Sequence, residues 1–181
     1  LFSPNGDWLA ANSDDKNIWL IQSDQLGSKE DNRKKLSSAN GLTYDMAVSA
    51  DSKWIAAVEY DSNIADYNRV LLAGLDGTKT FLSHDKEVIN AVTFTPDSKQ
   101  VITADDNGLI NIWNVENGEK SYSLEAKEVI LSIAVSPDGK YLAVGEGSGR
   151  ISIWDLGTTQ RVAQCENPRG PGVLEFSSDG R

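Results

Sequence analysis

The sequence predicts an all-β protein assembled from repeated four-stranded units, and three observations support this prediction. A short pattern of one apolar residue, one small hydroxylated residue, two turn residues and one small residue recurs five times, and its copies begin 46, 46, 41 and 41 residues apart. Apolar, β-branched segments flank the copies. No segment has a convincing helical period. A fixed spacing over the whole chain is the signature of a repeat architecture.

The five copies of the pattern are predicted to be tight turns between strands. They occupy residues 2–6, 48–52, 94–98, 135–139 and 176–180. Their Pro, Asp, Asn, Gly and Ser residues each favour turns for a separate backbone reason. Apolar residues precede and follow the fourth copy, at 130–135 and 141–144, which is the order strand, turn, strand.

Two further strands complete each unit. Residues 149–155 alternate in polarity and are β-branched, residues 108–114 match them at the same offset, and weaker strands are expected at 121–124 and 161–164. A unit of about 40–45 residues with four short strands is a β-propeller blade. We therefore expect four-stranded antiparallel blades, about four blade equivalents in all and three of them complete. The units lie around 1–42, 43–83, 84–125 and 126–165, with the start of a further blade at 166–181.

Charge, hydropathy and cysteine content narrow the possible partners. The net charge of −10 argues against nucleic acid, because binding to phosphates needs a basic face. No apolar run approaches the roughly 18 residues of a membrane helix. The single cysteine excludes a disulfide within the chain and favours a reducing compartment, so we expect a cytoplasmic protein. Closed propellers contain about 4–8 blades, and the first and last units here are incomplete, so we expect a fragment whose ring is completed by missing sequence or by another copy. A closed four-bladed ring is the alternative.

The sequence offers little for catalysis. His84 is the only histidine, so any Ser-His-Asp or Cys-His arrangement must use it. His84 and Cys165 together are too few ligands for a zinc site. The glycine-rich residues 145–149 lead into a strand rather than a helix, which is wrong for a phosphate-binding loop. We expect no catalytic residue, no cofactor and no metal.

The strand endings carry a family resemblance. Ile153-Trp154-Asp155, Ile112-Trp113-Asn114 and the Pro-Asp-Gly or Pro-Asp-Ser turns resemble the WD40 repeat family, and Ser83-His84 stands where that family has Gly-His. The resemblance implies a structural network of a His, a Ser or Thr, an Asp and a Trp within a blade. It assigns to this network His84, Thr103, Asn107 and Trp113 in the third unit, Trp154 in the fourth and Asp15 in the first. The fourth unit departs from the pattern, with Val144 and Ser148 at the other network positions.

The same resemblance implies a non-catalytic scaffold for protein–protein interaction, as the interaction domain of a larger regulatory protein. Function in such a ring lies on loops held by a rigid scaffold. By register, we predict an acidic rim that accepts a basic or amine-bearing protein segment, made by Asp14, Asp15, Glu59, Asp61, Asp66, Asp105, Asp106 and Glu146. Turns favour Asp in any case, so ordinary solvated turns are the alternative. A lactonase-like propeller enzyme and a periplasmic propeller resembling TolB also stay open.

Overall fold

Antiparallel strands make up nearly all the regular structure of the chain. The computed structural model describes residues 1–13, 17–27, 33–38, 43–60, 68–82, 84, 87–166, 170 and 172–180. Within these residues there are fifteen strands in four sheets and one turn of 3₁₀ helix at Ser23–Gln25. Three sheets have four strands and one has three, which confirms the expected propeller blades and the three complete units.

Each sheet is a blade whose strands follow one another in sequence order. Blade 1 contains β1 (Trp8–Asn12), β2 (Asn17–Gln22) and β3 (Lys34–Ser38). Blade 2 contains β4 (Thr43–Val48), β5 (Trp54–Tyr60), β6 (Asn68–Gly74) and β7 (Lys79–Leu82). Blade 3 contains β8 (Ile89–Phe94), β9 (Gln100–Asp105), β10 (Leu109–Asn114) and β11 (Lys120–Glu125). Blade 4 contains β12 (Ile130–Val135), β13 (Tyr141–Glu146), β14 (Arg150–Asp155) and β15 (Gln160–Glu166).

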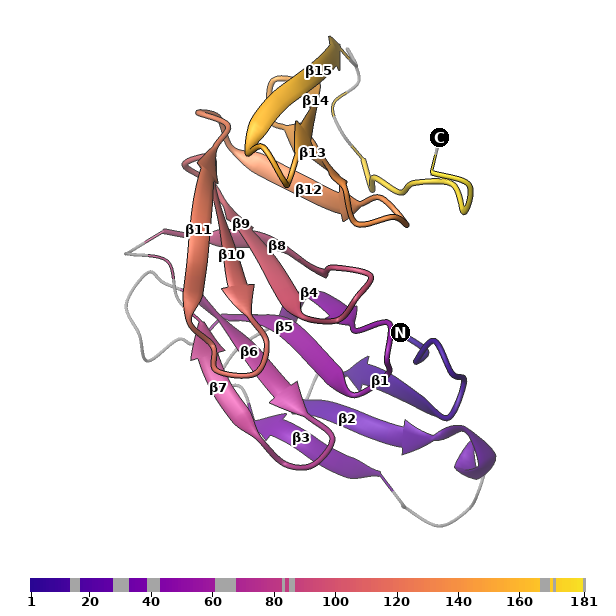
Figure 1. The fold of residues 1–181 in the computed structure, drawn as a ribbon. Coiled ribbons are helices and arrows are strands. Elements are labelled where there is room, and N and C mark those ends of the chain that lie inside the picture. Colours follow the sequence, from indigo (N-terminus) through magenta and orange to yellow (C-terminus); the bar gives the residue numbers. More distant parts are fainter. Residues whose placement is uncertain are drawn as a thin grey trace.

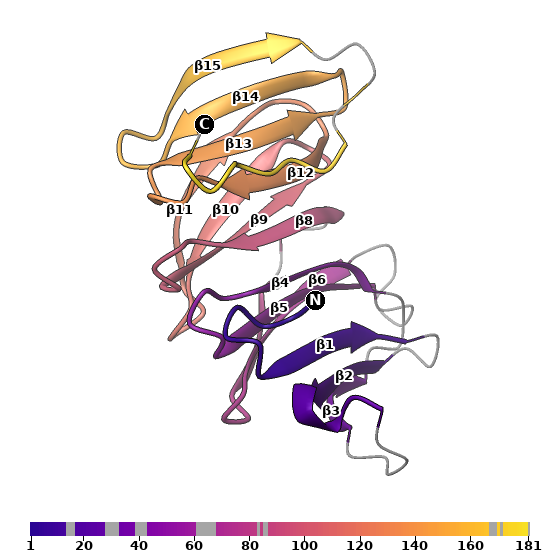
Figure 2. The same ribbon diagram turned by 90° about the vertical axis from the view of Figure 1, so that its right-hand side faces the viewer.

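The blades are arranged as an arc, with their first strands on the inner side (Figure 1). Figure 2 views the arc from this side, where β1, β4, β8 and β12 follow one another and the outer strands β3 and β15 lie at opposite extremes. The inner strands of neighbouring blades are in contact, β4 with β8 and β8 with β12. We call the end of the blades that carries the repeated turns the lower face. The opposite end, with the β9–β10 and β11–β12 connections, is the upper face.

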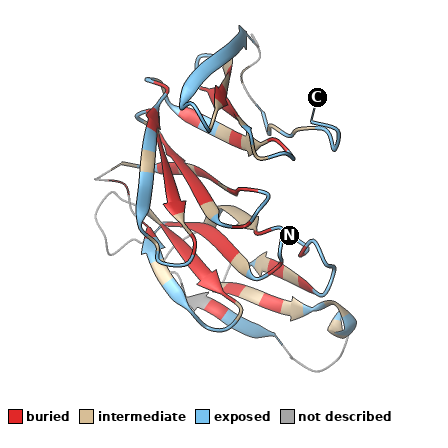
Figure 3. Cartoon of the chain, viewed as in Figure 1, coloured by how far each residue is buried: buried red, intermediate tan, exposed pale blue. Residues whose placement is uncertain are grey.

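The hydrophobic core lies between the blades. Three apolar clusters each fill the space between two adjacent sheets. Between blades 3 and 4, for example, Ile102 and Ile110 pack with Leu142, Val144 and Trp154. Each fully buried Ile or Leu contributes about 1.5–3 kcal/mol relative to an exposed side chain. Figure 3 shows burial concentrated in the second and third strands of the blades, such as β5, β9, β10 and β13, while the outer strand β15 is exposed along its whole length.

The repeated pattern folds as the same hydrogen-bonded turn in each blade. In blade 2 the Ser49 hydroxyl donates to Asp51 Oδ1 over 2.6 Å, and the Trp54 amide donates to Ser49 Oγ over 2.9 Å. Thr95 with Asp97 and Ser136 with Asp138 repeat the first of these bonds in blades 3 and 4. The hydroxylated residue and the Asp are therefore present in the pattern because they close the turn.

The last residue of these turns connects two blades. Ser52 and Ser98 have φ values of 61° and 60°, a left-handed conformation that costs a residue with a Cβ about 1–2 kcal/mol. Ser52 Oγ accepts a hydrogen bond from the Asn5 amide of blade 1 over 3.1 Å, and Ser98 Oγ accepts one from the Asp51 amide of blade 2 over 3.0 Å. We call this bond the blade clasp. Gly139 takes the position in blade 4 and has no hydroxyl, so the junction of blades 3 and 4 lacks the clasp.

A second bond between blades recurs on the inner side. The Val92 amide of β8 donates to Asp45 Oδ2 of β4 over 2.9 Å. Ser132 of β12 occupies the position equivalent to Asp45, and its Oγ accepts from the Leu174 amide over 3.1 Å. The C-terminal segment 172–176 is not a strand, but this bond places it beside β12 in the way that β8 lies beside β4. Figures 1 and 2 show the segment there.

Candidate functional site

Three carboxylates of the predicted rim lie inside the protein. Glu59, Asp105 and Glu146 are each 0% exposed, so the prediction that they form an exposed acidic rim is wrong. They occupy equivalent positions at or next to the ends of β5, β9 and β13. A cationic or hydrogen-bonding partner within the fold accompanies each of them, which allows a carboxylate to be buried there.

The partner in blade 3 is His84. Its Nδ1 lies 2.7 Å from Asp105 Oδ2, and its Nε2 lies 2.6 Å from Thr103 Oγ1. Thr103 Oγ1 in turn accepts the indole N–H of Trp113 over 2.8 Å. Because a carboxylate only accepts, Nδ1 carries the proton, and a neutral ring then accepts the Thr103 hydroxyl proton at Nε2. Every polar atom in this chain of bonds is satisfied.

The acid of this network is Asp105, so the assignment of Asn107 is wrong. Asn107 is exposed in the β9–β10 turn, and its amide donates to Asp105 Oδ1 over 3.0 Å. The Leu109 amide donates to the same oxygen over 2.8 Å. Asp105 therefore closes the turn with one oxygen and holds His84 with the other.

Arginines replace the histidine in blades 2 and 4. Arg69 of β6 lies 3.7 Å from Glu59, with its guanidinium 3.7 Å above the ring of Phe81. Arg150 of β14 lies 3.1 Å from Glu146, which also accepts the hydroxyl proton of Ser152. The equivalent carboxylates are thus paired with different partners, an arginine in blades 2 and 4 and His84 in blade 3.

Blade 4 lacks the remainder of the network. Val144 stands where blade 3 has Thr103, and the buried indole nitrogen of Trp154 has no acceptor among the described residues. Asp15, the predicted network residue of blade 1, lies outside the described residues. The predicted rim residues Asp14, Asp61 and Asp66 also lie outside them.

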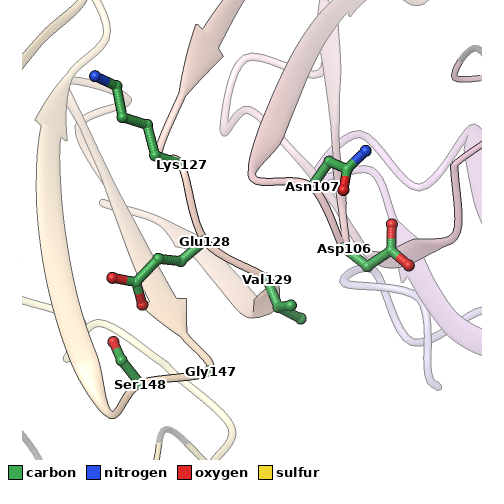
Figure 4. Close-up of a pocket in the computed structure, with 7 residues that line it drawn as sticks. All are labelled: Asp106, Asn107, Lys127, Glu128, Val129, Gly147 and Ser148. Atoms are coloured by element: carbon green, nitrogen blue, oxygen red, sulfur yellow. The ribbon is translucent and has the colours of Figure 1, made fainter.

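Asp106 is the described member of the predicted rim that reaches the surface, and it borders a cleft on the upper face. The cleft has a volume of about 380 Å³ and lies between blades 3 and 4 (Figure 4). Three connections line it: Asp106 and Asn107 from β9–β10, residues 127–129 from β11–β12, and residues 147–148 from β13–β14. In Figure 4, Lys127 points away from the cleft and Glu128 points towards Ser148. Val129 lies between the two sides and is 40% exposed.

The cleft is acidic. A hydrogen bond from Ser148 lowers the pKa of Glu128, and the positive charge of Arg150 lowers this pKa further, so Glu128 is ionised near neutral pH. Asp106 Oδ1 accepts from the Val88 amide over 3.3 Å, which holds its carboxylate at the cleft edge. An adjoining hollow, lined in part by Asn107 and Lys127, adds two further carboxylates, Glu87 and Glu125.

We call the surface around Glu87, Asp106, Glu125 and Glu128 the acidic cleft. Sequence reasoning missed three of these residues because it searched the loops within blades. The three lie instead on or beside the connections between blades. Within the described part of the chain, no group of three His, Cys, Asp or Glu side chains could hold a metal ion. No helix in the same part is long and apolar enough to cross a membrane.

Comparison with known proteins agrees with this architecture. The chain is 29% identical over 131 residues to Protein hir1 of Schizosaccharomyces pombe, a match that covers 64% of this chain and 14% of hir1. The chain thus spans a small part of that relative's length. The family model "WD domain, G-beta repeat" matches residues 1–22, 68–114 and 118–155, more than half of the chain. The chain therefore belongs to the WD40 repeat family, whose repeats generally serve as protein-interaction scaffolds.

Proposed function

We propose that this protein is a non-catalytic scaffold whose acidic cleft holds a basic or amine-bearing segment of a partner protein. We further propose that it acts as the interaction domain of a larger regulatory protein. One observation carries the proposal. The buried carboxylates already have cationic or histidine partners, but no salt bridge within the described residues involves Glu87, Asp106 or Glu125.

A lysine or arginine side chain suits the cleft for two reasons. Its charge would face carboxylates that have no salt bridge within the described residues, which favours encounter and fixes orientation. The aliphatic part of the same side chain would pack against the half-exposed Val129 on the cleft wall. Arg150 neutralises only part of the negative charge of the cleft. Its single positive charge is shared by Glu128, Glu146 and Glu166, at 2.9, 3.1 and 3.7 Å.

Charge reversal tests the proposal. The variant Asp106→Lys/Glu125→Lys is compared with Glu116→Lys/Glu119→Lys, which makes the same charge change on exposed residues of the lower face of blade 3. Binding of a fluorescent lysine-rich peptide is measured by anisotropy. We expect the upper-face variant to bind about tenfold or more weakly, since each exposed ion pair is worth about 0.2–1 kcal/mol and reversal adds repulsion. Equal loss in both variants would contradict a role for the cleft.

The bonding of His84 supports a scaffold over the lactonase-like alternative. His84 is 5% exposed and both of its ring nitrogens are engaged, one by Asp105 and one by Thr103. A general base needs a nitrogen within reach of a substrate proton. Replacement of His84 is therefore expected to reduce stability rather than to abolish a reaction. A cytoplasmic location stays a prediction, and so does the absence of nucleic acid among the partners.

We also propose that another sheet covers the outward face of blade 4, supplied by further sequence or by a second copy. Ile110, Ile112 and Leu124 of blade 3 are 0%, 0% and 4% exposed because blade 4 covers them. The equivalent positions in blade 4 are only half-buried or exposed, at Ile151, Ile153 and Cys165. Light scattering gives the mass of the natural, full-length protein in solution, and a thiol reagent reports the accessibility of Cys165 in the same sample. A monomer in which Cys165 reacts freely with a thiol reagent would count against a covering sheet.

A further inference from the structure

Four cations gather on the outer edges of blades 1 and 2, although the protein has a net charge of −10. Arg33, Lys34 and Lys35 lie at the start of β3, and Lys79 begins β7. All four are exposed. We call this surface the basic edge. It lies on other blades than the acidic cleft and towards the opposite, lower face.

Contacts across the junction of the two blades hold Lys34 and Lys79, whereas Arg33 and Lys35 lie beside Trp19 of blade 1. Lys34 Nζ donates to the Leu75 carbonyl of blade 2 over 3.3 Å, and Lys79 Nζ donates to the Leu36 carbonyl of blade 1. An ammonium group has three N–H donors, and each of these lysines uses one of them in a bond to the described residues. The Arg33 guanidinium lies 4.6 Å from the ring of Trp19, and Lys35 pairs with Trp19 in the strand register.

The positive charge of these lysines is not cancelled within the described residues. No salt bridge there joins a carboxylate to Lys34, Lys35 or Lys79. The charge of Lys34 lowers the pKa of the nearby Asp76. The Asp76 carboxylate, however, accepts a hydrogen bond from the Thr78 amide over 2.9 Å within its own turn. The hydrogen bonds from Thr78 lower the pKa of Asp76 more than the charge of Lys34 does.

We propose that the basic edge binds an acidic, extended segment of a partner protein. The edge follows β3, the outermost strand of blade 1, which pairs within its sheet with β2 alone. Its five residues span roughly 16 Å at about 3.3 Å per residue, which suits a short stretch of extended chain. A strand of this kind presents unpaired backbone groups as well as side chains. Nucleic acid fits less well, because its long phosphate backbone would also meet the acidic remainder of the protein.

The test uses a fluorescein-labelled Glu-rich peptide and anisotropy at low salt. The variants are Lys35→Glu, in which the mutated side chain does not bridge the blades, and Lys34→Glu/Lys35→Glu. The matched control is Lys99→Glu/Lys140→Glu, which reverses two exposed lysines in the lower-face turns of blades 3 and 4. We expect about tenfold or more weaker binding for the β3 double variant, a smaller loss for Lys35→Glu and less than twofold change for the control. Near-UV circular dichroism verifies that each variant is folded.

Two further probes separate the classes of partner. Duplex DNA and vesicles containing phosphatidylserine are titrated in the same assay, and we expect both to bind more weakly than the Glu-rich peptide. The proposal is overturned if the peptide binds no better than a neutral one, if Lys35→Glu leaves its affinity unchanged, or if DNA or vesicles bind more tightly than the peptide through the same lysines. None of these results bears on the acidic cleft, whose test uses a peptide of opposite charge.

Discussion

Thr103→Val tests whether the hydrogen-bond network of blade 3 stabilises the fold. The substitution keeps the branched shape of the side chain and removes one oxygen atom. That atom accepts from Trp113 over 2.8 Å and lies 2.6 Å from His84 Nε2. Thr103, His84 and Trp113 are 0%, 5% and 8% exposed, so water cannot readily replace the lost partner.

The expected loss of folding stability follows from the two polar groups that are left without a hydrogen-bond partner. A buried polar group that loses its partner costs about 1–3 kcal/mol, so the indole N–H and the imidazole nitrogen together cost about 2–6 kcal/mol. For a chain of this length, 1 kcal/mol shifts the melting temperature by about 2–4 °C. We therefore expect the melting temperature to fall by roughly 4–24 °C.

Val144→Thr is the reverse substitution at the equivalent position in blade 4. It supplies an acceptor next to Trp154, whose buried indole N–H has none among the described residues. We expect it to change stability by no more than about 1 kcal/mol, because the new bond offsets burial of the hydroxyl. The matched control is Val70→Thr, at another fully buried valine, where a destabilisation of about 1–3 kcal/mol is expected.

Urea denaturation followed by far-UV circular dichroism measures all three variants under one set of conditions. The reasoning is refuted if Thr103→Val costs less than about 0.5 kcal/mol, well below the penalty for even one buried group without a partner. It is also refuted if Val144→Thr destabilises the protein as much as Val70→Thr does. The indole N–H of Trp154 would then not have formed a stabilising hydrogen bond with the new hydroxyl.

Three other predictions concern the junctions between blades. Ser98→Ala is expected to reduce the free energy of unfolding by about 1 kcal/mol, because it loses the blade clasp but keeps the left-handed backbone. Ser98→Gly also loses the clasp but relieves the backbone strain, so its free energy of unfolding should stay within about 0.5 kcal/mol of the parent. Urea denaturation measures both variants. Gly139→Ser could form the missing clasp, since its Cβ meets only Pro96 at 3.6 Å, so it should be better tolerated than Gly139→Ala in the same assay. The pKa of Glu128 in the folded state is lowered from 4.5. Ionised Glu128 therefore contributes to the stability of the fold above pH 4.5, and this contribution is lost as the pH falls through the folded-state pKa. A pH series of melting temperatures should therefore show Glu128→Gln less stable than the parent near pH 7 and equal to it in acid.

The repeat was readable from the sequence because its signals are local. A hydroxylated residue and an Asp two positions later, as in Ser49 and Asp51, close each turn by themselves, so the pattern is visible without knowledge of distant contacts. Strand alternation after the turn is equally local. The prediction that His84, Thr103 and Trp113 belong together came from the family register, and the structure joins these three residues.

The fate of the acidic residues was harder to predict. Asp105 and Asp106 are adjacent in sequence, yet one is fully buried and the other reaches the surface, because successive residues at a strand end point to opposite sides. One available signal was overlooked. Glu59, Asp105 and Glu146 fall at the same position of three successive units, each after an apolar strand, and a repeated acid of this kind indicates a role inside the blade. Ser52 and Ser98 gave a similar signal, since they replace the glycine expected at the end of the turn.

The origin of each buried carboxylate's partner bears on how the blades could be rearranged. Arg69 and Arg150 lie on the third strand of the blade whose carboxylate they serve, so blades 2 and 4 carry both halves of their ion pair. His84 instead precedes β8, in the connection that enters blade 3. A graft that moved residues 89–125 alone into another propeller would bury Asp105 without its histidine. A graft beginning before His84 would keep the pair, so the boundary for transplanting this blade lies in the incoming connection rather than at its first strand.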